Sequence, residues 1–361
     1  MTACIRSPAA LRGRCYKFLI AYLDPRKYIK FVRTTVLLSI ALLWLGGCTH
    51  NTNVSFDFPT PPPAPSATPL AKLELKRDAE LEAQIAKIAA EAKGKVGVAA
   101  VVIETGEAAL LNAEGRFPMQ SVYKLPIAMA VMEQIRLGEL DLDEKIGVSK
   151  DDFVRPGMRS PLRDANPNGG EFTIRELIRL SLVESDGTAS DVLIRVAGGP
   201  DETQSYLTQI GIRDMKVVNT EKEIGRDWQT QYENWATPMA SVELLRSLEA
   251  DAKNFWPRML DQEYSGNEFL LRDMTQSIPG EKRLKGLLGI RHSLDKVAHK
   301  TGTGGTRNGI TGATNDIGII YLPNGKHLAI AVFVSDSPAD EKTRETVIAK
   351  IARVVWDRWN N

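Results

Sequence analysis

The strand patterns of this chain lie near its two ends, and a long helical stretch separates them. The runs rich in Val, Ala and Ile that are typical of buried strands cover residues 96–103, 108–111, 296–301, 316–322 and 328–334. The turn Pro323-Asn324-Gly325 predicts a hairpin between the last two runs. A sheet can combine strands from both ends only if the residues between them form a separate lobe. The fold class is therefore α/β (α+β), with an antiparallel sheet and an inserted all-helical lobe.

Helical patterns fill the middle of the chain and also occur beside the strands. They cover residues 72–93, 121–135, 173–182, 189–196, 241–248 and 339–359. The first and last of these are expected to flank the sheet as terminal helices. Residues 218–238 are polar and irregular, and their length favours a functional Ω-type loop. We expect an α/β lobe at about 72–116 and 280–361, and a helical lobe at about 117–279.

The N-terminus is predicted to be a targeting segment. Basic residues precede an apolar run at 34–45 that is too short for a comfortable membrane span, as in the core of a signal peptide. The run ends Leu45-Gly-Gly-Cys48, which resembles the bacterial lipobox, where the cysteine is lipidated and becomes the mature N-terminus. The alternative is an N-terminal anchor with an unmodified cysteine. We expect a lipoprotein signal peptide at 1–47 and a periplasmic protein that is held on a membrane through Cys48.

Composition narrows the choice of partners and cofactors. Residues 48–71 begin with Cys48 and continue as a proline-rich stretch that predicts a stiff linker, so the folded body would be 72–361. The chain has a net charge of +1, and its basic excess lies in the targeting segment, so the body gives no reason to expect nucleic-acid binding. No cysteine follows Cys48, and the histidines show no ligand spacing, so we expect no metal and no cofactor. We expect a monomer.

The pattern Ser-x-x-Lys occurs twice, at Ser121 and Lys124 and again at Ser293 and Lys296. Residues i and i+3 share one face of a helix, whereas positions three apart on a strand point to opposite sides. Only the first copy lies at the start of a helical pattern. A serine there also lies beside free backbone N–H groups, which stabilise a developing oxyanion.

Two further motifs follow the first copy in order. Ser185-Asp-Gly187 lies between two helical patterns, and Lys300-Thr-Gly-Thr303 ends a strand pattern. S-x-x-K, S-D-N and K-T-G together are the signature of serine β-lactamases and penicillin-binding proteins. Each motif is weak alone, and the alternative for the first is an N-cap serine beside a surface lysine. The three in this order point to a serine nucleophile.

Longer stretches around these motifs make the resemblance specific. The chain resembles the class A serine β-lactamases, and within them the PER/VEB-type extended-spectrum subgroup, over about residues 79–359. The segments that carry the resemblance are Phe117-Pro-Met-Gln-Ser-Val-Tyr-Lys124, Ser160-Pro-Leu-Arg-Asp164, Thr220-Glu-Lys-Glu223 with Asp227-Trp-Gln-Thr-Gln-Tyr-Glu-Asn-Trp-Ala-Thr-Pro238, Arg283-Leu-Lys-Gly286 and Ala298-His-Lys-Thr-Gly-Thr303. It implies a serine β-lactamase/penicillin-binding-protein-like fold and hydrolysis of the β-lactam amide bond, which confers resistance.

The resemblance also implies a role for each site residue. Ser121 would be the acylated nucleophile, Lys124 would assist proton transfer, and Ser185 would relay a proton to the β-lactam nitrogen. Glu221, in the Ω-type loop, would activate the water that releases the acyl-enzyme; the acylation base is disputed between the lysine and the glutamate in this family.

The substrate contacts implied by the resemblance lie on the last motif. Lys300 and Thr301 of the Lys-Thr-Gly302 motif would bind the substrate carboxylate, and the N–H groups of Ser121 and Thr303 would form the oxyanion hole. Arg283 resembles an additional carboxylate-binding arginine of the subgroup. The alternative for Arg283 is a cation on a helix surface.

The chain departs from the usual class A pattern in the loop and in the second motif. Gly187 and Gly225 stand where asparagines are common, and Lys222 stands where proline in a cis bond is common. A cis bond before a residue other than proline costs about 2.5–4 kcal/mol, so we predict a trans bond. The usual Arg–Asp clamp across the loop is also missing, with Asn219 near its first position. These changes predict a differently folded and roomier loop.

Two other functions remain open at this level. A D,D-peptidase of the same superfamily would lack the deacylating carboxylate that Glu221 supplies. A non-catalytic β-lactam-binding envelope lipoprotein would have degraded motifs.

Overall fold

A computed structural model describes residues 68–253, 266–289 and 297–360. Its main element is a seven-stranded sheet in the order β1-β3-β2-β12-β11-β10, with β9 paired to β11. The strands are β1 (Lys76–Arg77), β2 (Lys95–Val102), β3 (Glu107–Leu111), β9 (Val297–Thr303), β10 (Thr306–Arg307), β11 (Ile310–Tyr321) and β12 (His327–Ser337). The described pairs are antiparallel except that β1 runs parallel to β3. The sheet is therefore mixed, although its long strands are antiparallel as predicted.

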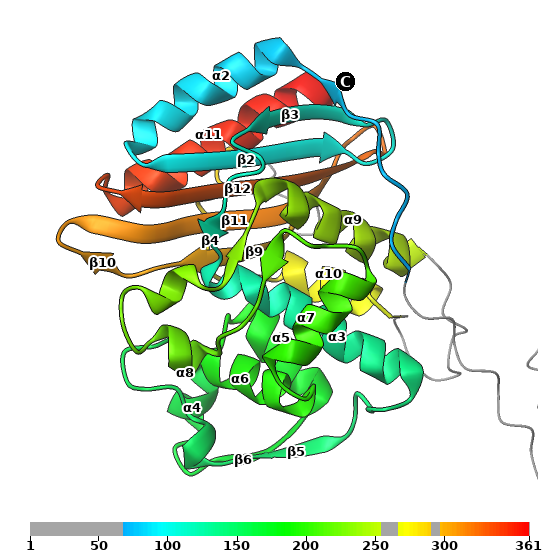
Figure 1. Ribbon diagram of the computed structural model, residues 1–361, viewed down its shortest axis with the longest axis vertical. Coiled ribbons are helices and arrows are strands. Elements are labelled where there is room, and N and C mark those ends of the chain that lie inside the picture. Colours follow the sequence, from blue (N-terminus) through cyan, green and yellow to red (C-terminus); the bar gives the residue numbers. More distant parts are fainter. Residues whose placement is uncertain (1–67, 254–265, 290–296, 361) are drawn as a thin grey trace, which may run out of the picture. The chain divides into compact units, whose positions relative to one another are not determined.

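Two helices cover the outer face of this sheet, α2 (Ala79–Ala89) and α11 (Glu341–Trp359), as Figure 1 shows. Alternate residues of β2 divide between the two faces. Val98 and Val102 pack toward these helices, whereas Ala99 and Val101 pack toward the helical lobe. Apolar side chains on both faces of the strand explain the unbroken hydrophobic run in the sequence.

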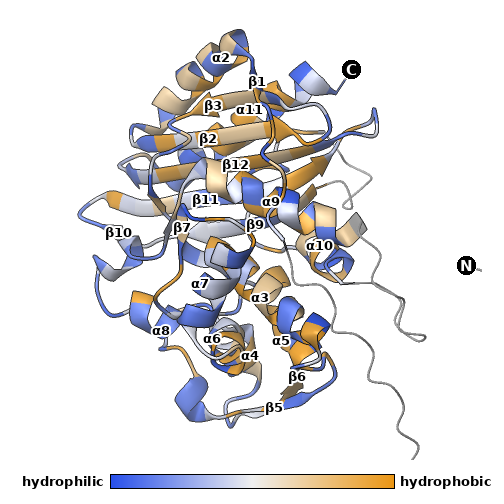
Figure 2. Ribbon diagram, turned by 45° about the vertical axis from the view of Figure 1, so that its right-hand side comes forward, coloured by the Kyte–Doolittle hydropathy of each residue, from blue (hydrophilic) through white to orange (hydrophobic). Residues whose placement is uncertain are grey.

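The helical lobe lies against the other face (Figure 1). Its helices are α3 (Lys124–Leu137), α4 (Pro161–Ala165), α5 (Ile174–Val183), α6 (Gly187–Val196), α7 (Pro200–Gln209), α8 (Glu221–Ile224), α9 (Pro238–Lys253) and α10 (Glu268–Thr275). Two small sheets join the lobe: β4 (Phe117–Pro118), β8 (Trp235–Ala236) and β7 (Met215–Lys216) in one, and β5 (Lys145–Val148) with β6 (Gly170–Thr173) in the other. Apolar colour follows the central strands and the inner helices in Figure 2.

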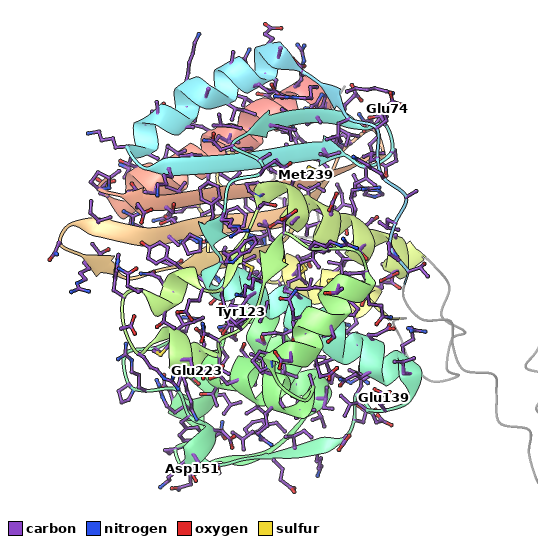
Figure 3. All side chains as sticks on the ribbon, viewed as in Figure 1. Glu74, Tyr123, Glu139, Asp151, Glu223 and Met239 are labelled. Atoms are coloured by element: carbon purple, nitrogen blue, oxygen red, sulfur yellow. The ribbon has the colours of Figure 1, made fainter. Side chains whose placement is uncertain are left out.

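Helix α3 is the buried axis of this lobe. Its residues from Lys124 to Glu133 are all buried. Figure 3 shows Tyr123, directly before the helix, deep among packed side chains, whereas Glu139 beyond its far end is exposed. A helix enclosed on every side holds its first turn in one place. Lys124 of the Ser-x-x-Lys motif is the first residue of α3, and Ser121 lies in the turn directly before it.

Most of the predicted elements occur, with shifted bounds. The predicted turn Pro323-Asn324-Gly325 does join β11 to β12. The helix predicted over 72–93 is wrong at its start, because β1 occupies part of it and pairs with β3. The helix begins only after Asp78, whose side chain accepts a hydrogen bond from the backbone N–H of Leu81 at 3.1 Å.

Two sequence predictions are not decided by the described residues. The signal peptide and most of the linker lie outside them, so the division into 1–47, 48–71 and 72–361 stays a prediction, as does the division into lobes. Ser293 and Lys296, the second Ser-x-x-Lys copy, also lie outside the described residues. Within the described ranges, no helix is both long enough and apolar enough to span a membrane.

Candidate active site

Ser121 lies in a turn of 3-10 helix, Gln120–Tyr123, which runs directly into α3. Its neighbour Gln120 has a left-handed backbone with φ of 49°. Few residues other than glycine adopt this conformation, so the turn must be held by its surroundings. The side chain of Gln120 donates to Oε1 of Gln231 at 2.9 Å and ties the turn to the 218–238 loop.

Lys124 follows one turn later, at the position the motif predicts. Its Nζ lies 2.8 Å from Oε1 of Glu221 and donates to the carbonyl oxygen of Ser185 at 2.8 Å. Ser121 Oγ donates to the same Glu221 oxygen at 3.4 Å. Lys124 is fully buried. One carboxylate oxygen therefore contacts both the candidate nucleophile and the candidate base, which gives the serine proton a direct path to an acceptor.

Ser185 links this cluster to the sheet. It precedes α6 and has a left-handed backbone with φ of 57°. Lys300, from β9, donates from Nζ to Ser185 Oγ at 2.9 Å and is fully buried. Burial, followed by the positive charge of Lys124, lowers the pKa of Lys300 well below its usual value. Ser185 thus contacts both lysines, Lys300 through its hydroxyl and Lys124 through its backbone carbonyl, which is a suitable place for a proton relay.

Strand β9 runs very close to the nucleophile turn. A Cβ on Gly302 would lie 2.2 Å from the carbonyl oxygen of Met119, so only glycine permits this approach. Asn315, on the neighbouring strand β11, donates from Nδ2 to the carbonyl oxygens of Pro118 at 2.8 Å and Met119 at 3.2 Å. The backbone of β9 is thereby fixed beside Ser121.

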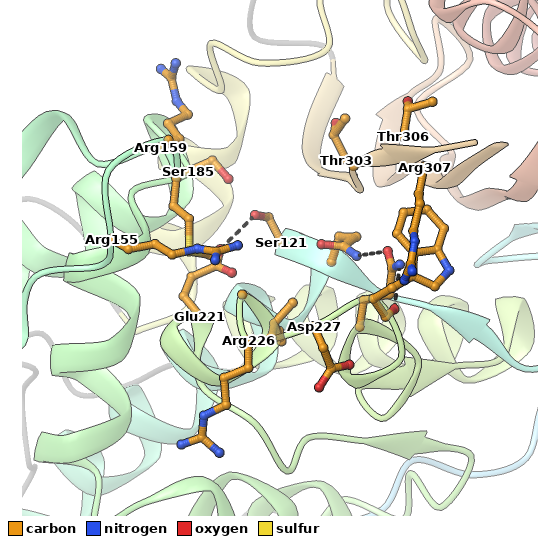
Figure 4. Close-up of a pocket in the computed structure, with 18 of the residues that line it drawn as sticks. Ser121, Arg155, Arg159, Ser185, Glu221, Arg226, Asp227, Thr303, Thr306 and Arg307 are labelled. Atoms are coloured by element: carbon orange, nitrogen blue, oxygen red, sulfur yellow. Dashed lines mark hydrogen bonds between the residues drawn. The ribbon is translucent and has the colours of Figure 1, made fainter. Parts of the chain in front are cut away.

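A cleft of about 640 Å³ opens at this point. Ser121, Ser185 and Glu221 line it from the helical lobe, and Thr301 and Thr303 line it from β9. Figure 4 shows Ser121 near its centre, with the dashed bond to Glu221. A pocket of this size that collects a few convergent polar groups is typical of a small-molecule site.

Arg283 lies close to β9 but is not a surface cation, because it is only 3% exposed. Its guanidinium donates to the carbonyl oxygens of Gly302 and Asn315 at 3.2 and 3.0 Å, and to Thr303 Oγ1 at 2.8 Å. Its Nε donates to Glu345 at 3.2 Å. Most of its donors are therefore used within the protein. The contact with a substrate carboxylate stays a prediction, and the observed bonds show that Arg283 holds the end of β9.

The 218–238 loop is closed at its neck by Asn234, which the sequence did not single out. Its side-chain oxygen accepts from the N–H groups of Val218 and Asn219, both at 2.9 Å, and its amide donates to the carbonyl of Asn219 at 2.8 Å. The Asn219 side chain donates to Glu233 at 2.8 Å. Hydrogen bonds of two asparagine side chains stand where an Arg–Asp clamp is usual. The loop contains helix α8, a 3-10 turn and β8, so it is more regular than the sequence predicted.

Asp191, on α6, holds the short helix that carries Glu221. Its two carboxylate oxygens accept from the N–H of Glu221 at 2.7 Å and of Lys222 at 3.1 Å. Burial raises the pKa of Asp191 to about 7. No motif marks this residue; only the N–H groups left free at the start of a helix suggest that some acceptor is needed. The described peptide bonds include no cis bond, so the bond from Glu221 to Lys222 is trans, as predicted.

The two glycines in asparagine positions are surrounded by atoms from other segments. A Cβ on Gly187 would lie 2.9 Å from Cγ of Glu221. A Cβ on Gly225 would lie 2.8 Å from Sδ of Met158 and 3.2 Å from Nε of Arg155. The space of the missing side chains is thus taken by the loop glutamate and by the segment before α4. Within the described ranges, no group of three or more His, Cys, Asp or Glu side chains is arranged to hold a metal ion.

A serine before a buried helix, a lysine on the next turn and a carboxylate shared between them are typical of serine hydrolases that act through an acyl-enzyme. The family model described as "Beta-lactamase enzyme family" matches residues 80–359. The chain belongs to this family, and it is a hydrolase that acts on β-lactams.

Individual relatives agree. The chain is 37% identical to β-lactamase VEB-1 of Pseudomonas aeruginosa over 267 residues, which cover 74% of this chain and 86% of that protein. It is 36% identical to extended-spectrum β-lactamase PER-1 of the same organism over 278 residues, covering 76% and 86%. The crystal structure of a β-lactamase from Chitinophaga pinensis superposes with a TM-score of 0.71 at 38% identity, covering 77% of this chain and 99% of that one.

These findings confirm the predicted resemblance, the fold and the reaction class. The class A β-lactamase fold places strands from both chain ends in one sheet, as the sequence indicated. Hydrolysis of β-lactams, with the resistance it brings, is the activity of this family. Neither a D,D-peptidase nor a non-catalytic binding protein is favoured.

Proposed function

We propose that this β-lactamase works through a Ser121 acyl-enzyme. Ser121 Oγ attacks the β-lactam carbonyl carbon, its proton passes to the Lys124–Glu221 pair, and the ring amide bond breaks as Ser185 delivers a proton to the leaving nitrogen. The single observation that supports this most is the Glu221 oxygen within reach of both Ser121 Oγ and Lys124 Nζ. Lys300, donating to Ser185 Oγ, is placed to orient that proton relay.

Glu221 also serves the second half of the reaction. A water held by its carboxylate attacks the ester carbonyl, gives its proton to Glu221 and releases Ser121 with the open-ring acid. The N–H groups of Ser121 and Thr303 bind the carbonyl oxygen as it becomes negative in both steps. Lys300 and Thr301 bind the ring carboxylate, and Arg283 supports them through Thr303.

The substrate range of this enzyme includes oxyimino-cephalosporins. Support comes from the relative named extended-spectrum β-lactamase PER-1 and from the changed loop neck, where Asn234 replaces a charged clamp. Useful kcat/KM on an oxyimino-cephalosporin supports this range, and activity confined to small penicillins contradicts it.

The location of the protein rests on its N-terminus. We propose that residues 1–47 are removed, that Cys48 carries the lipid, and that residues 48–71 hold a monomeric enzyme away from a membrane of the bacterial envelope, on its periplasmic side. The support is the Leu45-Gly-Gly-Cys48 sequence after a short apolar run.

The roles of Ser121 and Glu221 are tested by trapping the intermediate. Ser121→Ala is expected to abolish nitrocefin turnover and to form no adduct with benzylpenicillin by mass spectrometry. Glu221→Gln is expected to accumulate an adduct with the mass of one intact benzylpenicillin, because the variant can still be acylated but is no longer deacylated. Glu139→Gln, an equal change of charge on an exposed residue beyond α3, serves as the matched control. Normal steady-state turnover by Glu221→Gln contradicts its role as the deacylation base.

A further inference from the structure

The wall of the cleft carries more positive charge than the chemistry above uses. Four arginines line it, Arg155, Arg159, Arg226 and Arg307, against two carboxylates, Glu221 and Asp227. Glu221 is already paired with the ammonium of Lys124. The outer part of the cleft is therefore positively charged, although the protein body is not basic.

Two of these arginines are paired with the protein itself. Arg159 lies 3.2 Å from a carboxylate oxygen of Glu184, and Arg226 lies 3.4 Å from one of Glu223. The side chains of Arg155 and Arg307 form no hydrogen bond and no ion pair within the described residues, and both residues are exposed. A cation in a concave site with no protein partner is free to accept an anionic ligand.

Local structure puts these two cations on different walls of the cleft. Arg155 precedes α4, and its Nε would lie 3.2 Å from a Cβ at residue 225, so Gly225 leaves the space beside α8 that Arg155 uses. Arg307 ends β10, at the turn from the β9 edge of the sheet into β11. In Figure 4 the two side chains lie to either side of Ser121.

A β-lactam bound for attack by Ser121 has its ring carboxylate beside Lys300 and Thr301. Its acyl side chain then extends along the rest of the cleft, where these arginines lie. Resting on the function proposed above, we propose that Arg155 and Arg307 are specificity-determining residues that favour β-lactams with a second anionic group on the acyl side chain. Each is an exposed charge that gains a partner, and an exposed ion pair is worth roughly a two- to fivefold change in affinity.

Three penicillins that differ at one carbon of the acyl side chain test this. Benzylpenicillin is neutral there, carbenicillin carries a carboxylate and ampicillin carries an ammonium. In Arg155→Gln/Arg307→Gln, the kcat/KM of carbenicillin relative to benzylpenicillin is expected to fall about two- to fivefold from the wild-type ratio, mainly through KM, because its one side-chain carboxylate pairs with one arginine at a time. The ratio for ampicillin is expected to stay the same or to rise, because a repulsion is removed. Arg213→Gln, an exposed arginine away from the cleft, is the matched control and is expected to leave both ratios unchanged.

A second measurement needs no variant. Raising NaCl from about 0.05 to 0.5 M shortens the range of exposed charges and should raise the wild-type KM for carbenicillin more than that for benzylpenicillin. This inference is overturned if both proteins hydrolyse benzylpenicillin and the kcat/KM of carbenicillin relative to benzylpenicillin is the same in wild type and double variant. The proposed function would still stand in that case. If the wild type hydrolyses none of the three penicillins, the proposed function fails, and the inference fails with it.

Discussion

Gly302 sets the distance between β9 and the nucleophile. The Met119 carbonyl oxygen occupies the place of a Cβ at this residue, so any larger side chain must push the strand away. Gly302→Ala is expected to lower kcat for nitrocefin by about 100-fold, because the Thr303 N–H would leave the oxyanion hole. Gly305→Ala is the matched control, since its Cβ would meet nothing within 4 Å. A kcat within about twofold of wild type for Gly302→Ala would show that the strand position does not limit the reaction.

Asp191 connects the position of Glu221 to pH. Its folded-state pKa of about 7 lies above its ordinary value of 3.8. The folded protein therefore holds a proton that the unfolded chain releases, so this residue's contribution to stability is complete below about pH 4 and is lost as pH rises through 7. In that window each pH unit is worth up to about 1.4 kcal/mol of unfolding free energy.

The variant Asp191→Asn should lack this slope. Its unfolding free energy, measured by urea denaturation from pH 4 to 8, is expected to change less with pH than that of wild type. The N–H groups of Glu221 and Lys222 bond to different oxygens of Asp191, and asparagine replaces one of these acceptors with an NH₂ donor. One of the two bonds is therefore lost, so deacylation should also slow and acyl-enzyme should accumulate. Parallel pH curves for the two proteins would contradict the raised pKa.

The loop that carries Glu221 depends on one buried side chain for its closure. Asn234 bonds to three backbone groups of Val218 and Asn219, and its own carbonyl accepts from the N–H of Met119 at 2.9 Å. It thus joins the two ends of the loop to the residues before the nucleophile turn. Hydrogen bonds of the Asn234 side chain therefore hold the two ends of this loop together.

Asn234→Ala is expected to leave buried backbone groups unpaired and to reduce the free energy of unfolding by about 3 kcal/mol. Hydrogen exchange should quicken first in residues 218–224, and the acyl-enzyme should live longer as Glu221 loses its place. Asn219→Ala removes only the partly exposed bond to Glu233 and should cost about 1 kcal/mol or less. Equal losses in the two variants would show that Asn234 does not close the loop.

Local patterns were enough to predict the parts of the fold and site that depend on neighbours in the chain. Ser121 and Lys124 are one turn apart, and the spacing alone places them on one face. β1 could not be predicted, because Lys76 and Arg77 are polar and pair with β3 only through backbone groups. Asn234 and Asp191 were missed for a similar reason. Each acts through its side chain on backbone groups distant in sequence, and no pattern around it differs from that of an ordinary surface residue.

The complete site exists only in the folded protein, because its residues come from distant parts of the chain. Ser121, Ser185, Glu221 and Lys300 come from segments spread over half the chain, and the sheet that carries Lys300 needs β2 from near the start. The packing of both lobes sets distances such as the 2.8 Å between Lys124 Nζ and Glu221 Oε1. The spacing of residues in the sequence does not determine such distances. A change in either lobe should therefore act on the reaction through these distances.

Anchoring itself is open to a direct experiment on the full chain. If Cys48 is lipidated after removal of residues 1–47, its acyl chains should hold the enzyme on a membrane, since two or more chains give stable binding. Cys48→Ala is expected to move nitrocefin-hydrolysing activity from the membrane pellet to the soluble fraction or to leave an uncleaved precursor, visible by its mass. Cys15→Ala changes a cysteine before the predicted cleavage site and should leave the activity in the pellet. If wild type and Cys48→Ala both stay in the pellet at the mass of a chain that still carries residues 34–45, the anchor is that apolar segment and not a lipid.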